Sequence, residues 1–289
     1  MTAPHKDELS GVDTTGHEWD GIRELDNPLP RWWLWVFYAC IAYAIGYCIY
    51  YPAIPLINSA TQGISGYSSR AELHQEVAAA EEGRAGLIAQ IDATNVEDIA
   101  KNDSLHRFAV SGGASAFKVY CSQCHGSGAQ GSPGYPNLND DVWLWGGTVE
   151  EIHQTITHGI RYNGDEDTRF SEMPAFGRDQ ILSGSDVRAA ANFVGKLANL
   201  EHDAALAEAG ATVYADNCVS CHGEAGKGMR DLGAPNLTDA VWLYGDTVAE
   251  IAAQISAPQH GVMPAWGERL GDVTVKQLAV FVHSLGGGE

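Results

Sequence analysis

Two short stretches, VYCSQCHGSG at residues 119–128 and NCVSCHGEAG at residues 217–226, share the pattern Cys-x-x-Cys-His. The two thiols of this pattern can form thioether bonds with the vinyl groups of a haem, and the following histidine can bind the haem iron. Its occurrence twice favours c-type haem over an accidental match. The sequence therefore predicts two haems c, each held by two cysteines and one histidine. The predicted residues are Cys121, Cys124 and His125 for the first haem and Cys218, Cys221 and His222 for the second.

Two other kinds of site also use a Cys-x-x-Cys pair. A thioredoxin-like redox pair follows a strand in a βαβ unit, and no strand pattern precedes Cys121 or Cys218. A zinc site built from two such pairs usually has them about 15–20 residues apart. Here nearly one hundred residues separate the pairs, so both alternatives are disfavoured.

The motifs belong to an internal repeat. PNLNDDVWLWGGTVEEI (136–152) and PNLTDAVWLYGDTVAEI (235–251) are identical at 12 of 17 positions, and SEMPAFG (171–177) resembles GVMPAWG (261–267). Each unit ends in a predicted amphipathic helix with a Ser or Asp cap. This predicts two mostly helical, tandem cytochrome c domains of the class I type, residues 108–200 and 201–289.

Methionine is the expected sixth ligand, because a thioether stabilises reduced haem iron. The repeated methionines are Met173 and Met263, which follow His125 and His222 by 48 and 41 residues. Met229 has no counterpart in the first unit and is predicted to be a loop or packing residue. Spacing alone leaves open whether each unit supplies its own methionine or the two units exchange them.

Other repeated side chains have less specific readings. His158 and His260 both precede glycine and are predicted to lie beside a ligand or at the surface. Trp143 and Trp242 are predicted to pack beside the haems. Asn137 and Asn236, each after a proline, are expected to shape the loop that lines the axial histidine, where a carbonyl could accept its other N–H.

The stretch WWLWVFYACIAYAIGYCIYY, residues 32–51, has no charged residue. As a helix it would span about 30 Å, the thickness of a bilayer's hydrocarbon core, and its ends are aromatic. It begins too late for a cleaved signal peptide, so it predicts a single transmembrane helix. Residues 1–31 are then a tail, and residues 52–107 a partly helical linker, with helices expected at 69–93 and 95–102.

Charge predicts the orientation of this helix and limits its partners. Arg23 and Arg31 precede the apolar stretch, and no basic residue follows it until Arg70, so the tail is expected in the cytoplasm and the repeat in the periplasm. A net charge of −20 argues against nucleic-acid binding. An acidic chain can attract basic protein partners instead.

These features together resemble subunit III, the membrane-anchored dihaem cytochrome c subunit of cbb3-type cytochrome c oxidases. The resemblance rests on DGIRELDNPLPRWWLW before the apolar stretch, YYPAIP after it, the tandem Cys-x-x-Cys-His units and the MPAF and MPAW segments. It extends from about residue 19 to the C-terminus.

The resemblance implies an electron-transfer subunit of a terminal oxidase in the bacterial inner membrane. Such a subunit takes electrons from a soluble cytochrome c. It passes them to a monohaem cytochrome c subunit and on to the haem–copper subunit, where O2 is reduced to water. It has no catalytic site of its own. The resemblance also implies crossed ligation, with His125 paired to Met263 and His222 to Met173.

Two other functions compete with this one. A free-standing, membrane-anchored dihaem carrier would serve another respiratory complex and would not purify with haem b and copper. A dihaem peroxidase needs one haem without a methionine ligand, which the matched Met173 and Met263 disfavour.

Overall fold

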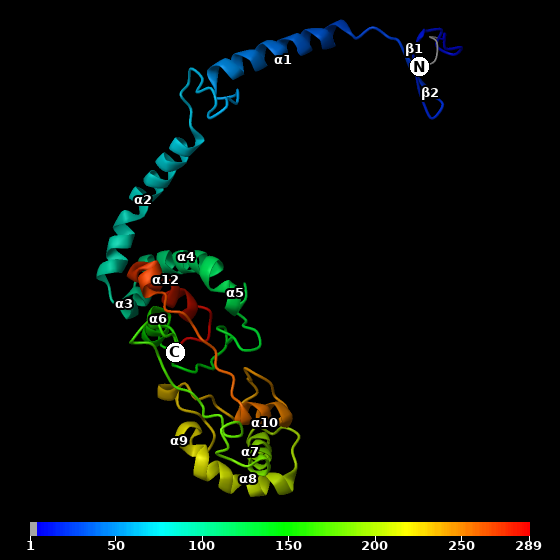
Figure 1. Ribbon diagram of the computed structural model, residues 1–289. Helices are drawn as coiled ribbons and strands as arrows, with labels where there is room; N and C mark the ends of the chain where they lie inside the picture. The colour runs from blue at the N-terminus through cyan, green and yellow to red at the C-terminus, as the bar shows by residue number, and fades with distance from the viewer. Residues whose placement is uncertain (1–4) are drawn as a thin grey trace. The chain divides into compact units, whose positions relative to one another are not determined.

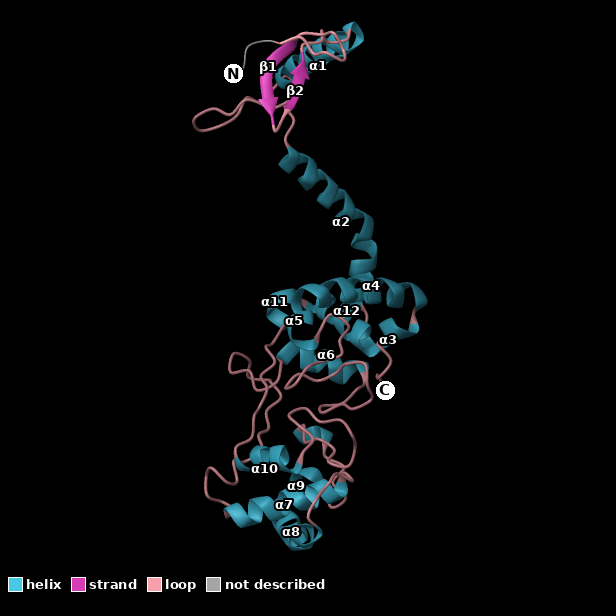
Figure 2. Ribbon diagram, turned by 90° about the vertical axis from the view of Figure 1, so that its right-hand side faces the viewer, coloured by secondary structure: helices cyan, strands magenta, loops and turns pink. Residues whose placement is uncertain are grey.

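The computed structural model describes residues 5–289. The chain forms two compact units, residues 1–82 and 83–289. Each unit is described by itself (Figures 1 and 2).

Within residues 1–31, which the sequence predicts to be a tail, the first unit contains a hairpin. Strand β1 (Thr14–Trp19) pairs with the antiparallel strand β2 (Ile22–Leu25), and Trp19 lies opposite Ile22. The two residues between the strands, Asp20 and Gly21, have φ angles of 50° and 85°. Asp-Gly is a preferred pair for a two-residue turn with positive φ, so the turn closes the hairpin.

Helix α1 (Arg31–Tyr50) is the apolar helix that the sequence predicts. None of its residues is buried in the protein, and within residues 5–289 it is the one helix long and apolar enough to cross a membrane. Trp32 and Trp35 near one end are more than two-thirds exposed, and Tyr47 and Tyr50 at the other about half. Large apolar side chains left open in this way fit a membrane anchor.

Most of the remaining chain is helical, as predicted. Helix α2 spans Ser69–Ala93, the predicted range, and α3 spans Val96–Lys101. The helices of the first repeat are α4 (Asp103–Tyr120), α5 (Ser122–His125), α6 (Val149–His158) and α7 (Gly184–Leu197). Those of the second repeat are α8 (Ala204–Asn217), α9 (Val219–His222), the 3-10 turn η1 (Arg230–Leu232), α10 (Val248–Ser256), α11 (Gly267–Leu270) and α12 (Asp272–His283).

The second unit contains two hydrophobic cores, and the two repeats exchange their last helices between them. The first core joins α4 and α6 of the first repeat to α12 of the second. The second core joins α7 of the first repeat to α8 and α10 of the second. Figure 1 shows α12, in red, against α4, in green, and α7 beside α8. We call these bodies the first lobe and the second lobe.

Glycines at equivalent positions allow both helix pairs to come close. A Cβ atom on Gly113 of α4 would lie 2.2 Å from the carbonyl oxygen of Gln277 in α12. A Cβ on Gly210 of α8 would lie 2.0 Å from the carbonyl oxygen of Ala189 in α7. Each opening helix therefore packs tightly on the closing helix of the other repeat.

The cores differ from the expected domains at residues 108–200 and 201–289. Residues 171–200 pack in the second lobe and residues after 262 in the first, because the chain crosses twice between lobes. The two closing helices, α7 and α12, both present aliphatic faces, so the amphipathic pattern alone did not distinguish the partners.

Candidate haem sites

A single helical turn assembles each Cys-x-x-Cys-His motif. Cys121 ends α4, and its carbonyl oxygen accepts hydrogen bonds from the backbone N–H groups of Cys124 (3.1 Å) and His125 (3.0 Å). In the second lobe Cys218 ends α8 and accepts from Cys221 (3.2 Å) and His222 (2.9 Å). Residues three and four apart share one face of a helical turn. Both cysteines and the histidine of each motif can therefore act on one ligand.

A backbone carbonyl orients each histidine. Nδ1 of His125 lies 3.1 Å from the carbonyl oxygen of Pro136, and Nδ1 of His222 lies 3.1 Å from that of Pro235. A carbonyl only accepts hydrogen bonds, so Nδ1 carries the proton and Nε2 keeps a free lone pair. Burial lowers the pKa of both histidines, although the hydrogen bond to the carbonyl opposes it. The rings are therefore neutral and ready to bind a metal.

Glycines after each motif let the chain turn back to that proline. Gly131 and Gly228 have φ angles of 70° and 77°, and their N–H groups donate to the carbonyl oxygens of His125 and His222. A Cβ on Gly131 would lie 2.5 Å from the carbonyl oxygen of Tyr135. Only glycine fits this turn without strain.

The first cysteine of each motif is partly buried. Burial raises the pKa of Cys121 and of Cys218 to about 11, so in the polypeptide both are neutral at pH 7. Redox-active and zinc-binding cysteines are thiolates, which an electropositive environment stabilises. A helix, not a strand, precedes each motif. The preceding helix argues against a thioredoxin-like pair, which follows a strand.

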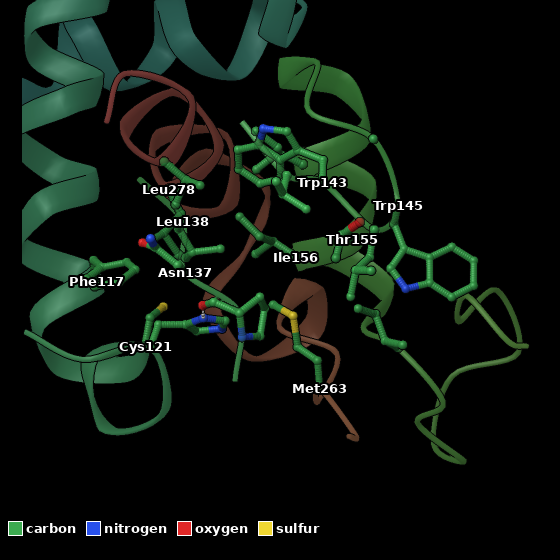
Figure 3. A pocket seen from close by; sticks show the side chains of 18 residues that line it. Phe117, Cys121, Asn137, Leu138, Trp143, Trp145, Thr155, Ile156, Met263 and Leu278 are labelled. Atoms are coloured by element: carbon green, nitrogen blue, oxygen red, sulfur yellow. Dashed lines mark hydrogen bonds between the residues drawn. The ribbon is translucent and has the colours of Figure 1, made fainter. Parts of the chain in front are cut away.

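The first lobe holds an apolar cavity beside its motif. Cys121 and His125 line the cavity, and so does Met263 from the second repeat (Figure 3). Its walls are apolar side chains of α4, α6, α12 and the VWL segment. They include Phe117, Trp143, Trp145, Ile152, Ile156, Leu278 and Val282.

The core of the second lobe also brings together side chains of both repeats. Met173, from the first repeat, packs against a core to which Cys218 and Trp242 also contribute. The indole N–H of Trp242 is buried and has no hydrogen-bond partner among residues 5–289. A buried donor without an acceptor is costly, and a haem carboxylate would satisfy it. The neutral histidines, the neighbouring cysteines, the apolar cavity of the first lobe and the unpaired N–H of the second all fit haem c.

Short backbone contacts join the segments where the chain crosses between lobes. Ile160 and Met263 exchange N–H···O bonds of 2.9 and 3.0 Å. Nε2 of His260 lies 3.2 Å from the carbonyl oxygen of Met173. His158 pairs through Nδ1 with Asp165 at 3.1 Å. His260 therefore contacts the segment that carries Met173, whereas His158 pairs within its own repeat.

Sequence reasoning missed Arg161, which contacts two segments that each carry a proposed methionine ligand. These are residues 171–173 and 261–263, and we call them the methionine segments. The Nε of Arg161 donates to the carbonyl oxygen of Gly261 (2.8 Å) and its Nη1 to that of Ser171 (3.0 Å). The signal was present in the spacings from His158 to Met173 and from His260 to Met263, 15 and three residues, which reveal extra residues in the first repeat.

Comparison with known proteins agrees with this geometry. Residues 11–58 match a family model described as the N-terminal domain of cytochrome oxidase-cbb3, FixP. Residues 108–194 and 205–282 match the model for subunit III of cbb3-type cytochrome c oxidase. The two matched segments follow the sequence repeat, and cytochrome c-type domains bind haem c.

Curated relatives match over nearly the whole chain. The chain is 58% identical over 285 residues to the cbb3-type cytochrome c oxidase subunit FixP of Sinorhizobium medicae (strain WSM419), covering 99% of this chain and 98% of the relative. It is 50% identical over 286 residues to subunit CcoP of Cereibacter sphaeroides, with 99% of both chains covered. The chain therefore belongs to the FixP/CcoP family of cbb3-type cytochrome c oxidase subunits.

Proposed function

We propose that this chain is the dihaem electron-transfer subunit of a cbb3-type terminal oxidase. It takes electrons from a soluble cytochrome c and passes them towards a monohaem cytochrome c subunit and a haem–copper subunit. When bound, a haem c supplies an iron that alternates between ferrous and ferric states and so carries one electron at a time. The protein's own part is to hold, orient and shield the two haems.

The ligand set of the proposal is crossed between the repeats. Cys121 and Cys124 would hold the first haem, with His125 and Met263 as axial ligands. Cys218 and Cys221 would hold the second, with His222 and Met173. The observation that carries this assignment is the presence of Met263, and not Met173, in the cavity lined by Cys121 and His125.

Two protein ligands on each iron imply electron transfer without O2 chemistry on this chain. Between Trp32 and Tyr50, helix α1 contains no Asp, Glu, His, Lys or Arg, the side chains that usually form a proton path. We therefore assign O2 reduction to the haem–copper subunit and propose that α1 serves as an anchor. The basic residues Arg23 and Arg31 favour a cytoplasmic N-terminus and periplasmic lobes in the bacterial inner membrane.

Purification of the native complex tests this function. We expect haem staining of the denatured subunits to show two covalent haems on this chain, and the complex to contain haem b, copper and a second c-type subunit. A chain that purifies with two haems c but without haem b and copper would instead be a free-standing carrier. Hydrogen peroxide turnover by the isolated chain would point to a peroxidase.

The charge of the lobes predicts how the donor is recognised. From residue 118 to the C-terminus the chain has 22 Asp and Glu residues against 10 Lys and Arg. We expect a basic soluble cytochrome c to reduce this chain with a rate constant that falls about tenfold or more from ~0.01 M to ~0.15 M salt, because salt screens exposed charges. Stopped-flow reduction measures this rate. An acidic cytochrome c of similar potential is the control, and a salt-independent rate with the basic donor would refute acidic docking.

A further inference from the structure

The two repeats differ most in length directly before a proposed methionine ligand. Met173 follows His158 by 15 residues, whereas Met263 follows His260 by three. The first repeat therefore has 12 extra residues, 159–170, which we call the inserted loop. The function proposed above gives this loop no role.

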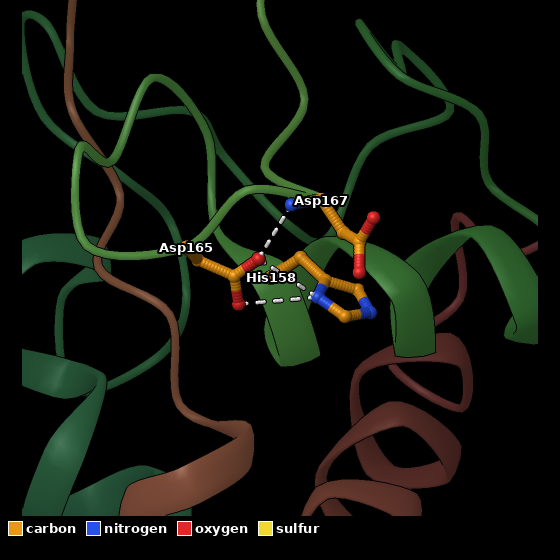
Figure 4. A group of neighbouring side chains, drawn as sticks. All are labelled: His158, Asp165 and Asp167. Carbon is orange, nitrogen blue, oxygen red and sulfur yellow. Dashed lines mark hydrogen bonds and ion pairs between the residues drawn. The ribbon is translucent and has the colours of Figure 1, made fainter.

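The inserted loop is closed on itself at its base. Nδ1 of His158 lies 3.1 Å from both carboxylate oxygens of Asp165, and the N–H of Asp167 donates to Asp165 at 2.8 Å (Figure 4). The N–H of Arg161 donates to the carbonyl oxygen of Arg169 at 2.8 Å. These contacts give the loop a defined shape, so the residue at its start can be positioned accurately.

Arg161 uses this position to reach both methionine segments. Its Nε donates to the carbonyl oxygen of Gly261 at 2.8 Å, and its Nη1 donates to that of Ser171 at 3.0 Å. Gly261 and Ser171 each lie two residues before a methionine, Met263 and Met173. One guanidinium therefore binds equivalent carbonyls of the two segments, although these segments serve different lobes.

The backbone conformation of Arg161 is energetically unfavourable, so other contacts must stabilise it. Its φ angle is 52°, in the left-handed region that L-residues other than Asn, Asp and Gly rarely adopt. The planar fork of a guanidinium can donate in two fixed directions at once, which a lysine ammonium on a flexible stem does less well. The carbonyl oxygens of Gly261 and Ser171 accept from two different nitrogens of this one guanidinium.

We propose that Arg161 is a positioning residue that ties the two methionine segments together and so stabilises thioether ligation at both haems. This inference rests on the proposed ligand set of Met173 and Met263. Its distinctive consequence is that one substitution, in a loop of the first repeat, acts on both haems.

Carbon monoxide uptake by the reduced protein tests whether Arg161 stabilises methionine ligation at both haems. Carbon monoxide binds a ferrous haem only after its methionine has left. We would compare Met263→Ala and Met173→Ala with the same variants carrying Arg161→Ala. Each methionine variant opens one haem to fast uptake, and the remaining slow phase reports the other haem. We expect Arg161→Ala to accelerate the slow phase about tenfold in both backgrounds, since each lost bond has a charged donor.

Two further variants separate the contact from general damage. Arg161→Lys keeps the positive charge and should give a smaller acceleration, again in both backgrounds. Arg178→Ala is the matched control, because Arg178 lies near Met173 but is exposed and pairs with Asp179. It should leave both slow phases unchanged, and haem staining should show two haems in every variant.

The possible failures are distinguishable. An acceleration in only one background, or in neither, would overturn the tie while leaving the ligand set intact. If Met173→Ala and Met263→Ala do not themselves open a haem to carbon monoxide, the ligand assignment fails and the inference fails with it.

Discussion

Met263→Ala is expected to change the haem held by Cys121 and Cys124 and to spare the haem held by Cys218 and Cys221. Loss of a thioether removes the ligand that stabilises reduced iron, so the midpoint potential of the first haem should fall by on the order of 0.1 V. Axial ligands set haem potentials over a range of about 0.8 V, so a change of this size is well within reach. Met173→Ala should have the same effect on the second haem.

Single-haem chains make this test independent of spectral overlap. With Cys121 and Cys124 both replaced by alanine, the chain retains the second haem alone. We expect Met263→Ala to leave the redox titration of that chain unchanged and Met173→Ala to lower its potential. The reverse pattern would show that each repeat ligates its own haem. No change with either methionine would rule out both as ligands.

Ending the chain after Ser256 is expected to destroy the first lobe, although the removed residues belong to the second repeat. The truncation removes Met263 and α12, whose Val275, Leu278, Val280 and Val282 are buried in the first core. Burial of each such side chain contributes about 1.5–3 kcal/mol, so four contribute about 6–12 kcal/mol. That is comparable with the whole stability of a domain, about 5–15 kcal/mol.

The second lobe should survive this truncation, because its core runs from Phe176 to Ile255. Limited proteolysis followed by haem staining measures the outcome. A protected, haem-bearing fragment should contain Cys218 and Met173, and the segment around Cys121 should be cleaved. A control chain that lacks only residues 1–30 should keep both lobes. Survival of the first haem and loss of the second would contradict the exchange of helices.

Local features were largely predictable from the sequence. Helix α2 has the predicted bounds, and α1 begins and ends within one residue of its predicted range, because apolar pattern and composition act over one or two turns. The Cys-x-x-Cys-His motifs were also recognisable from a few neighbouring residues. The Nδ1 atoms of their histidines lie within hydrogen-bond distance of the carbonyl oxygens of Pro136 and Pro235. The hairpin at Asp20 and Gly21 was missed although its turn residues are characteristic.

The exchange of helices was not predictable from these patterns. Helices α7 and α12 are both amphipathic, and α4 and α8 both carry a glycine at the crossing point, so either pairing would satisfy local sequence rules. The crossed ligation was implied only by family resemblance. The contacts of the inserted loop, residues 159–170, with the Met263 segment become visible only in three dimensions.

The pairing of α4 with α12 also sets an order of assembly. Ribosomes make the chain from the N-terminus, and domains generally fold as they emerge. The second lobe has all of its helices once residue 256 has been made, but the first lobe must wait for residues 272–283. The lobe encoded first therefore matures last. A nascent chain therefore carries an incomplete first lobe until α12 has been made. If synthesis stops between residues 256 and 272, the first lobe cannot fold, whereas the second lobe can.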